Sequence, residues 1–118
     1  MSNPVLEVIR DAIRQRRQLT FYYDGLYREV CPHAVGMKDG QWHLFVWQFG
    51  GSSRGGLKGE NWRCMVVSHI ASLTVRDGQW YRGWTKGYGP SSCIDIIDTV
   101  VDAAHAAEVL QTSTVRIR

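Results

Sequence analysis

The chain has 118 residues, of which 44% are apolar and 21% are charged, values typical of one globular domain with one core. No apolar run approaches the roughly 20 residues that a membrane helix needs, and the first residues lack the basic and apolar regions of a signal peptide. The net charge of +3 combines +5 over residues 1–92 with −2 over residues 93–118, which permits an anionic ligand, although a solvated surface explains it equally well.

The cysteines are odd in number and widely spaced. Such spacing suits thiols that are buried as small hydrophobic side chains in a reducing compartment. We therefore predict a cytoplasmic protein, without membrane contact, that has three unbonded thiols: Cys31, Cys64 and Cys93.

A helix is predicted over residues 1–18, because Asn3 is a good N-cap and Pro4 suits the first turn. Its apolar side chains recur at helical spacing and form an apolar stripe: Val5, Leu6, Ile9, Ala12 and Ile13. Arg10, Arg14 and Arg17 share another face. They are interpreted either as solvated charges that favour the helix dipole or as a ridge that faces phosphate groups.

Two hairpins are predicted next, each around an Asp-Gly pair. Residues 19–23 and 26–30 flank Asp24-Gly25, which predicts a type I′ turn. Pro32 interrupts the return strand, so the strand bends or lies at an edge there. The chain then continues through the second Asp-Gly pair, at positions 39 and 40.

Residues 41–49 form the predicted central strand, because both of its faces carry aromatic side chains. A strand that is covered on both sides belongs in the middle of a sheet or barrel. The Gly-rich residues 50–59 are predicted to form a loop.

Further strands are predicted at residues 61–67 and 71–76, with a break at 68–70. Asp77-Gly78 repeats the turn signal and predicts another hairpin into residues 79–81.

The C-terminal part is predicted as a loop over residues 83–92, followed by an ambiguous segment over 94–110. That segment alternates briefly and then fits a helix, which its alanines favour. Residues 114–118 alternate and predict a last strand.

These elements predict a mainly β fold with flanking helices, built on a small SH3/Sm-like antiparallel β-barrel. A single domain, 1–118, comprises the N-terminal helix (1–18), the barrel core (19–82) and the C-terminal loop, helix and last strand (83–118).

Enzyme signals are poor, because the sequence holds no CxxC, HExxH or P-loop motif. Cys31 and His33 lack a third catalytic partner, and together with Cys64 and His69 they show no metal-ligand spacing. One group of carboxylates is interpreted as an acidic solvated face: Asp95, Asp98 and Asp102. We predict no enzymatic activity, no metal and no cofactor, with a hydrolase that uses Cys31 or Cys64 as a further alternative.

Binding signals are stronger, because aromatic and cationic side chains alternate along the predicted sheet. Arginine offers a planar fork for phosphate, and aromatic rings offer stacking surfaces for bases. The candidate ligand- or nucleic-acid-binding residues are Tyr22, Arg28, His43, Trp47, Arg63 and His69. Burial in the core is the alternative for Trp47. Arg28 and Arg63 are the principal candidates, because a charge in mid-strand is costly unless it is paired or exposed.

Four segments between about residues 12 and 81 resemble the WYL domain of bacterial regulators. In chain order they are residues 19–25 after the helix, residues 28–35 with an Arg-x-Val-x-Pro step, Trp42-His43-Leu44 in place of the Trp-Tyr-Leu triplet, and residues 63–70 in place of a segment that ends in Asp-Arg-Ile.

The resemblance implies an SH3/Sm-like barrel that senses ligands in transcription regulation, and in some members binds single-stranded nucleic acid. It places Arg28, His43, Arg63 and His69 in ligand-site positions. The two histidines keep a planar donor but lose a permanent charge, which lowers the expected affinity for a polyanion. Family members usually follow a winged-helix DNA-binding domain, and no helix-turn-helix precedes the barrel here, so we expect a stand-alone module.

We therefore predict a regulatory module that recognises a nucleotide, single-stranded nucleic acid or another anionic ligand. The alternative is a protein-interaction or dimerisation domain of a regulatory complex. In that case the barrel edges and the acidic residues 93–118 contact a regulatory protein partner or a second copy of the chain.

Overall fold

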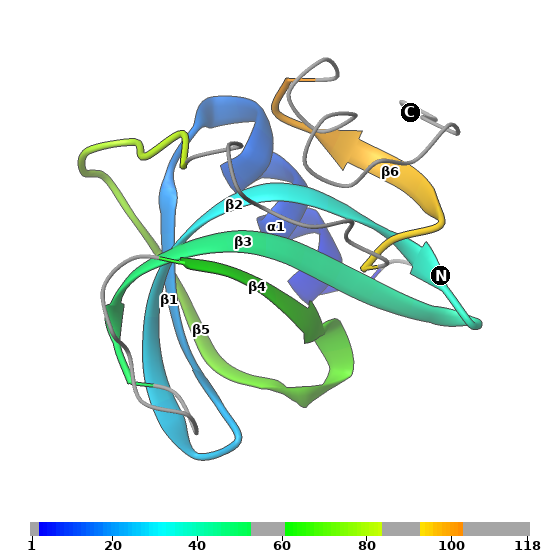
Figure 1. The fold of residues 1–118 in the computed structure, drawn as a ribbon, viewed down its shortest axis with the longest axis horizontal. Coiled ribbons are helices and arrows are strands. Elements are labelled where there is room, and N and C mark those ends of the chain that lie inside the picture. The colour runs from blue at the N-terminus through cyan, green and yellow to red at the C-terminus, as the bar shows by residue number, and fades with distance from the viewer. Residues whose placement is uncertain (1–2, 53–60, 84–92, 103–118) are drawn as a thin grey trace.

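The computed structural model describes residues 3–52, 61–83 and 93–102. Within them the chain forms one α-helix, one short 3-10 helix and a six-stranded sheet (Figure 1). The elements are α1 (Pro4–Gln15), β1 (Gln18–Tyr23), β2 (Leu26–Lys38), β3 (Gln41–Gly51), β4 (Asn61–Val66), η1 (Val67–His69), β5 (Ile70–Arg76) and β6 (Ile96–Val100). Neither helix of this part of the chain is long and apolar enough to cross a membrane.

Helix α1 begins and ends at residues whose local chemistry favours those positions. The side-chain oxygen of Asn3 accepts a hydrogen bond from the backbone N–H of Leu6 at 3.2 Å, and Pro4 occupies the first turn. At the other end Arg16 adopts the left-handed conformation, with φ of 52°. The helix is therefore shorter than the predicted range of 1–18, because this residue turns the chain into β1.

The sheet is antiparallel, and its main strand order is β4-β3-β2-β1-β5. Strand β3 lies between β2 and β4, so the prediction of a central strand at residues 41–49 is confirmed. Tight turns join β1 to β2 and β2 to β3, as predicted. Both central residues of each turn have positive φ, as type I′ turns require: Asp24 (55°), Gly25 (74°), Asp39 (51°) and Gly40 (75°).

Strand β2 is long and changes one of its partners midway. Its first part pairs with β1 and its last part pairs with β6, while β3 follows it along both parts. The register with β3 shifts between Pro32 and Ala34, close to the position where the proline was predicted to bend the strand. At Gly36 a Cβ would collide with the backbone carbonyl of Ile96, so glycine is required for β6 to approach β2 this closely.

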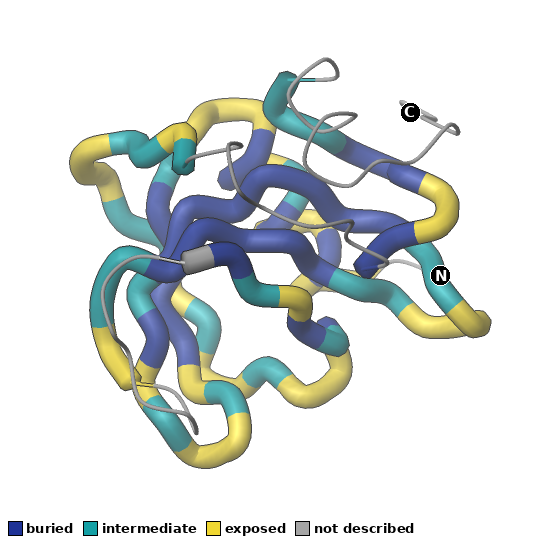
Figure 2. The backbone as a smooth tube through the Cα atoms, viewed as in Figure 1, coloured by how far each residue is buried: buried dark blue, intermediate teal, exposed yellow. Residues whose placement is uncertain are grey.

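Two apolar clusters cover the two faces of the sheet, and the central strands between them are buried (Figure 2). The helix-side cluster is formed by α1 and one face of the sheet, and includes Leu6, Ile9, Phe21, Val30, Leu44, Val46 and Met65. The β6-side cluster lies on the opposite face and includes Cys31, Phe45, Trp47, Trp62, Ile94 and Ile97. Alternate residues of β3 therefore serve different clusters, as expected of a strand covered on both sides.

The predicted closed SH3/Sm-like barrel is not confirmed. Within residues 3–52, 61–83 and 93–102, β4 and β5 are the two edges of the main sheet, and no strand pairing joins them. The hydroxyl of Tyr23 on β1 accepts a hydrogen bond from the backbone N–H of Val66 on β4 at 3.0 Å. A side chain thus bridges part of the opening that a closed barrel would fill with backbone hydrogen bonds.

The helix predicted within residues 94–110 is wrong for its described part, because Ile96–Val100 forms β6. These residues are mostly β-branched, which suits a half-buried pleated surface, and the edge of β2 offers backbone hydrogen bonds. The remainder of that predicted helix, the predicted strand at 114–118 and most of the predicted loops at 50–59 and 83–92 lie outside the described residues.

The third Asp-Gly pair does not form the predicted hairpin. Residues 77–83 have no regular secondary structure, and Trp80 and Tyr81 pack against the β6-side cluster. The side chain of Gln18 donates a hydrogen bond to the backbone carbonyl of Gln79 at 2.7 Å. Residues 77–83 therefore cross one face of the sheet and add no strand to it.

The prediction of three unbonded thiols is wrong for two of the cysteines. Cys64 on β4 and Cys93 before β6 form a disulfide, with a Cα–Cα distance of 5.5 Å. They are 29 positions apart in the sequence, so no local spacing pattern indicated the pair. Cys31 is a fully buried thiol, as predicted.

A buried ion pair connects α1 to β6. Arg10 contacts both carboxylate oxygens of Asp98, at 3.0 and 2.9 Å, and the two side chains are 12% and 5% exposed. Hydrogen bonding by Asp98 raises the pKa of Arg10 above its ordinary value, against a smaller lowering by burial. The prediction of a solvated acidic face is therefore wrong for Asp98.

The other two arginines of the predicted ridge also contact carboxylates. The pairs are Arg14–Asp11 at 3.5 Å and Arg17–Asp77 at 2.8 Å. The interpretation of this ridge as a set of phosphate contacts is therefore not supported, and support of the helix dipole and local pairing explain it better.

Candidate ligand-binding site

Arg28 of β2 is a buried cation, only 4% exposed. Its register partner on β1 is Phe21, so the Arg28 side chain lies on the face of the sheet that carries the helix-side cluster. The guanidinium donates to the side-chain oxygen of Gln48 at 3.3 Å and to the backbone carbonyl of Tyr23 at 3.1 Å. Its central carbon also lies 5.6 Å from the centre of the Tyr23 ring. These neutral contacts fix the position and plane of the guanidinium.

The side chain of Arg63, on β4, lies on the same face of the sheet. Its register partner on β3 is Val46, which belongs to the helix-side cluster. Gln48 lies two residues further along β3, so it faces the same side, where it binds Arg28. The structure thus brings the two predicted guanidinium groups to one face, on the two strands that flank β3.

His69 lies at the edge of this arrangement. It is exposed on η1, and its ring centre is 6.1 Å from that of Tyr23. The Tyr23 ring is therefore close to both Arg28 and His69. We define the arginine face by these residues: Tyr23, Arg28, Gln48, Arg63 and His69.

The other three predicted site residues lie elsewhere. Trp47 has no exposed surface and contacts Trp62 edge-on, at 5.0 Å between ring centres, in the β6-side cluster. His43 points away from the face of Leu44 and hydrogen-bonds the backbone carbonyl of Gln41 at 3.0 Å. Tyr22 is exposed on the outer face of the first hairpin. Trp47 is therefore a core residue, which was the alternative interpretation.

Two members of the arginine face were missed by sequence reasoning. Gln48 is fully buried, and it occupies the position where the Leu44 and Val46 alternation predicts an apolar side chain. A polar residue in such a series is a signal for a buried hydrogen-bond partner, which could have identified it. Tyr23 gave no such signal, because its neighbours are also aromatic.

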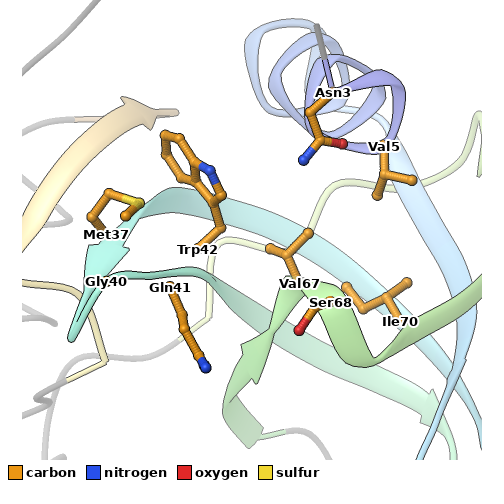
Figure 3. A pocket seen from close by; sticks show the side chains of 9 residues that line it. All are labelled: Asn3, Val5, Met37, Gly40, Gln41, Trp42, Val67, Ser68 and Ile70. Atoms are coloured by element: carbon orange, nitrogen blue, oxygen red, sulfur yellow. The ribbon is translucent and has the colours of Figure 1, made fainter. Parts of the chain in front are cut away.

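An apolar pocket of about 400 Å³ opens between the start of α1, the turn from β2 to β3, and η1 (Figure 3). Trp42, Val67 and Ile70 line it and also pack against the helix-side cluster. The side chains of Val5 and Met37 form further apolar wall. None of the predicted site residues lines this pocket, although two of them are sequence neighbours of lining residues.

The histidine and thiol that sequence analysis considered for catalysis belong to the core. His33 is 3% exposed, lies 4.9 Å from each of the Trp62 and Trp80 ring centres, and has Nε2 at 3.0 Å from the carbonyl oxygen of Tyr81. Cys31 Sγ accepts a hydrogen bond from the backbone N–H of Tyr81 at 3.4 Å. In the described part of the chain, no three His, Cys, Asp or Glu side chains gather as metal ligands would.

Comparisons with known proteins are consistent with this fold. Residues 4–75, more than half of the chain, match the sequence model of the WYL domain family. Among solved structures the chain is similar to Proteasome accessory factor B/C (PafBC) of Arthrobacter aurescens, with a TM-score of 0.50 and 20% identity. The similarity covers 72% of this chain and 13% of that chain, and at this identity it concerns the fold alone. No curated protein matches the sequence.

Proposed function

The chain belongs to the WYL domain family, and from this premise we propose that it is a ligand-sensing regulatory module whose ligand is an anion: a nucleotide, single-stranded nucleic acid or a similar phosphate compound. The module acts by binding, without enzymatic chemistry. The chain spans about an eighth of the solved PafBC chain that it resembles, so the activity of that larger protein is not part of the proposal.

The arginine face carries this proposal. Arg28 and Arg63 follow one face of the sheet, and Gln48 and Tyr23 hold the guanidinium of Arg28 in a fixed orientation. Arg63 is only partly buried, so a phosphate can approach its planar guanidinium, whereas Arg28, at 4% exposure, contributes its positive charge from the interior of the same face. The exposed ring of His69 beside Tyr23 adds an aromatic surface on which a base can stack.

Substitution of Arg63 by glutamine is expected to weaken binding of a short single-stranded oligonucleotide by about tenfold, because one guanidinium–phosphate contact is lost. The slope of log affinity against log salt concentration should fall by about one. Fluorescence anisotropy of a labelled oligonucleotide at several salt concentrations measures both quantities.

Arg14→Gln is the matched control, because it removes the same charge from an exposed position on α1. It should change affinity by less than about twofold. Equal losses in the two variants would indicate non-specific attraction to a basic protein. Wild-type binding that is absent, or insensitive to salt, would overturn the anionic ligand.

The interaction-domain alternative has weaker structural support. In the described part of the chain, the large exposed apolar side chains are distributed over several elements: Val5 and Val8 on α1, Tyr22 on β1, Tyr27 on β2, and Ile96 on β6. Dimerisation therefore stays a prediction, which sedimentation of the chain would test.

A further inference from the structure

The apolar pocket between α1, the β2–β3 turn and η1 is separate from the arginine face. None of the five residues that define the arginine face lines the pocket. The proposed recognition of an anion therefore gives the pocket no role, and the pocket needs a different ligand chemistry.

The lining of the pocket indicates that chemistry. Trp42, Val67 and Ile70 provide apolar surface, and none of the described residues that line the pocket carries a charge. An anion would find no counter-charge among these residues, and its desolvation would be uncompensated. The volume of about 400 Å³ lies within the range of small-molecule pockets in proteins.

One wall of the pocket is held in place from behind. The guanidinium of Arg10 lies 5.5 Å from the centre of the Trp42 ring, and Arg10 is itself fixed by both oxygens of Asp98. A side chain that is already ordered loses little entropy when a ligand packs against it. The indole is thus a ready stacking surface for a planar molecule, and the thioether of Met37 is a second favourable contact for an aromatic ring.

The few polar groups of the pocket set the orientation of a ligand. Ser68 and Gln41 line it with a hydroxyl and an amide, which can donate or accept one hydrogen bond to a neutral polar atom. The side-chain oxygen of Asn3 already accepts from the N–H of Leu6, so it caps the helix.

We propose that this pocket binds a neutral aromatic molecule of about two fused rings that carries one hydroxyl or carbonyl group. The ring system packs between Trp42 and Val67, and the polar atom lies towards Ser68. This site is independent of the arginine face, so the chain has two ligand sites of different chemistry.

The test uses 2-naphthol, which is neutral at pH 7, and its anionic counterpart 2-naphthoate. Isothermal titration calorimetry should show 2-naphthol binding with a Kd of about 1 mM or tighter, as expected for a ligand of this size. The carboxylate should bind at least about fivefold more weakly, because the described lining residues offer no cation. Absence of 2-naphthol binding, or tighter binding of the carboxylate, would overturn the proposal.

Ser68→Trp fills the pocket from an exposed position and should weaken 2-naphthol binding at least about tenfold. Thr74→Trp is the matched control, since it adds the same indole at an exposed position of β5 that does not line the pocket. It should leave the Kd within about twofold of the wild-type value.

A second measurement locates the site without any substitution. On addition of 2-naphthol, amide signals of Gly40, Gln41 and Ser68 should shift in ¹H–¹⁵N spectra of the wild-type chain. Shifts that cluster instead around Arg28 and Arg63 would overturn the proposal. Oligonucleotide affinity should be the same with and without 2-naphthol. The two proposed sites are therefore tested by different ligands, and the absence of binding at one does not hide binding at the other.

Discussion

Asp98→Asn is expected to lower the free energy of unfolding by about 3 kcal/mol, the lower end of the cost of removing one partner from a buried ion pair. The amide keeps the volume of the carboxylate but removes the buried counter-charge of Arg10, whose side chain is only 12% exposed. Arg10 retains its contact with Glu7, which is why the lower end applies. Urea denaturation, followed by tryptophan fluorescence, measures the change.

Asp11→Asn is the matched control for this substitution. It breaks the Arg14–Asp11 pair, whose side chains are 46% and 64% exposed, and should cost less than about 0.5 kcal/mol. The double variant Arg10→Met with Asp98→Leu should recover most of the loss, because it replaces the buried pair by apolar contacts. A loss in Asp98→Asn no larger than in Asp11→Asn would show that α1 and β6 do not depend on this contact.

Trp47→Ala is expected to lower the free energy of unfolding by about 3–5 kcal/mol, because it leaves a cavity in the β6-side cluster. Trp47 has no exposed surface, and its ring lies against Trp62. The loss is a large share of the stability of a domain of this size. Thermal and urea denaturation would both report it.

Tyr22→Ala provides the comparison, because Tyr22 was also predicted as a ligand contact but is 46% exposed. Its loss should cost less than about 1 kcal/mol. If Trp47→Ala unfolded like the wild type and lost oligonucleotide affinity instead, the residue would be a ligand contact and its burial in the core would be wrong.

Local rules predicted the first part of the fold well. The two Asp-Gly turns have the positive φ angles that such pairs favour, and the apolar residues of β3 alternate between two clusters. The same turn signal failed at Asp77-Gly78, because a hairpin also needs a following strand that the sheet can accept. Here Trp80 and Tyr81 lower their exposure by packing on the β6-side cluster.

Long-range contacts were the part that the sequence could not supply. Nothing in the spacing of Cys64 and Cys93 indicates that β4 and the approach to β6 are neighbours. The burial of Asp98 likewise depends on Arg10, which is far away in the sequence and close only in the fold. Helical spacing of the acidic residues therefore gave the wrong environment for Asp98.

For the candidate site, the sequence identified the cations but not what surrounds them. Arg28 and Arg63 were chosen because a charge in mid-strand is costly without a partner, and both do follow one face of the sheet. The sequence could not tell that Gln48 and Tyr23 hold Arg28, because the relevant atoms come from three strands.

The disulfide has a consequence for the order in which the strands come together. The hairpins around β2 close short loops, whereas β6 must reach β2 from far along the chain, at a larger loss of loop entropy. The bond holds Cys93, just before β6, against β4, so it confines the unfolded chain near its native pairing. Reduction of the disulfide therefore lengthens the conformational search by which β6 finds β2, although no residue of either strand is changed.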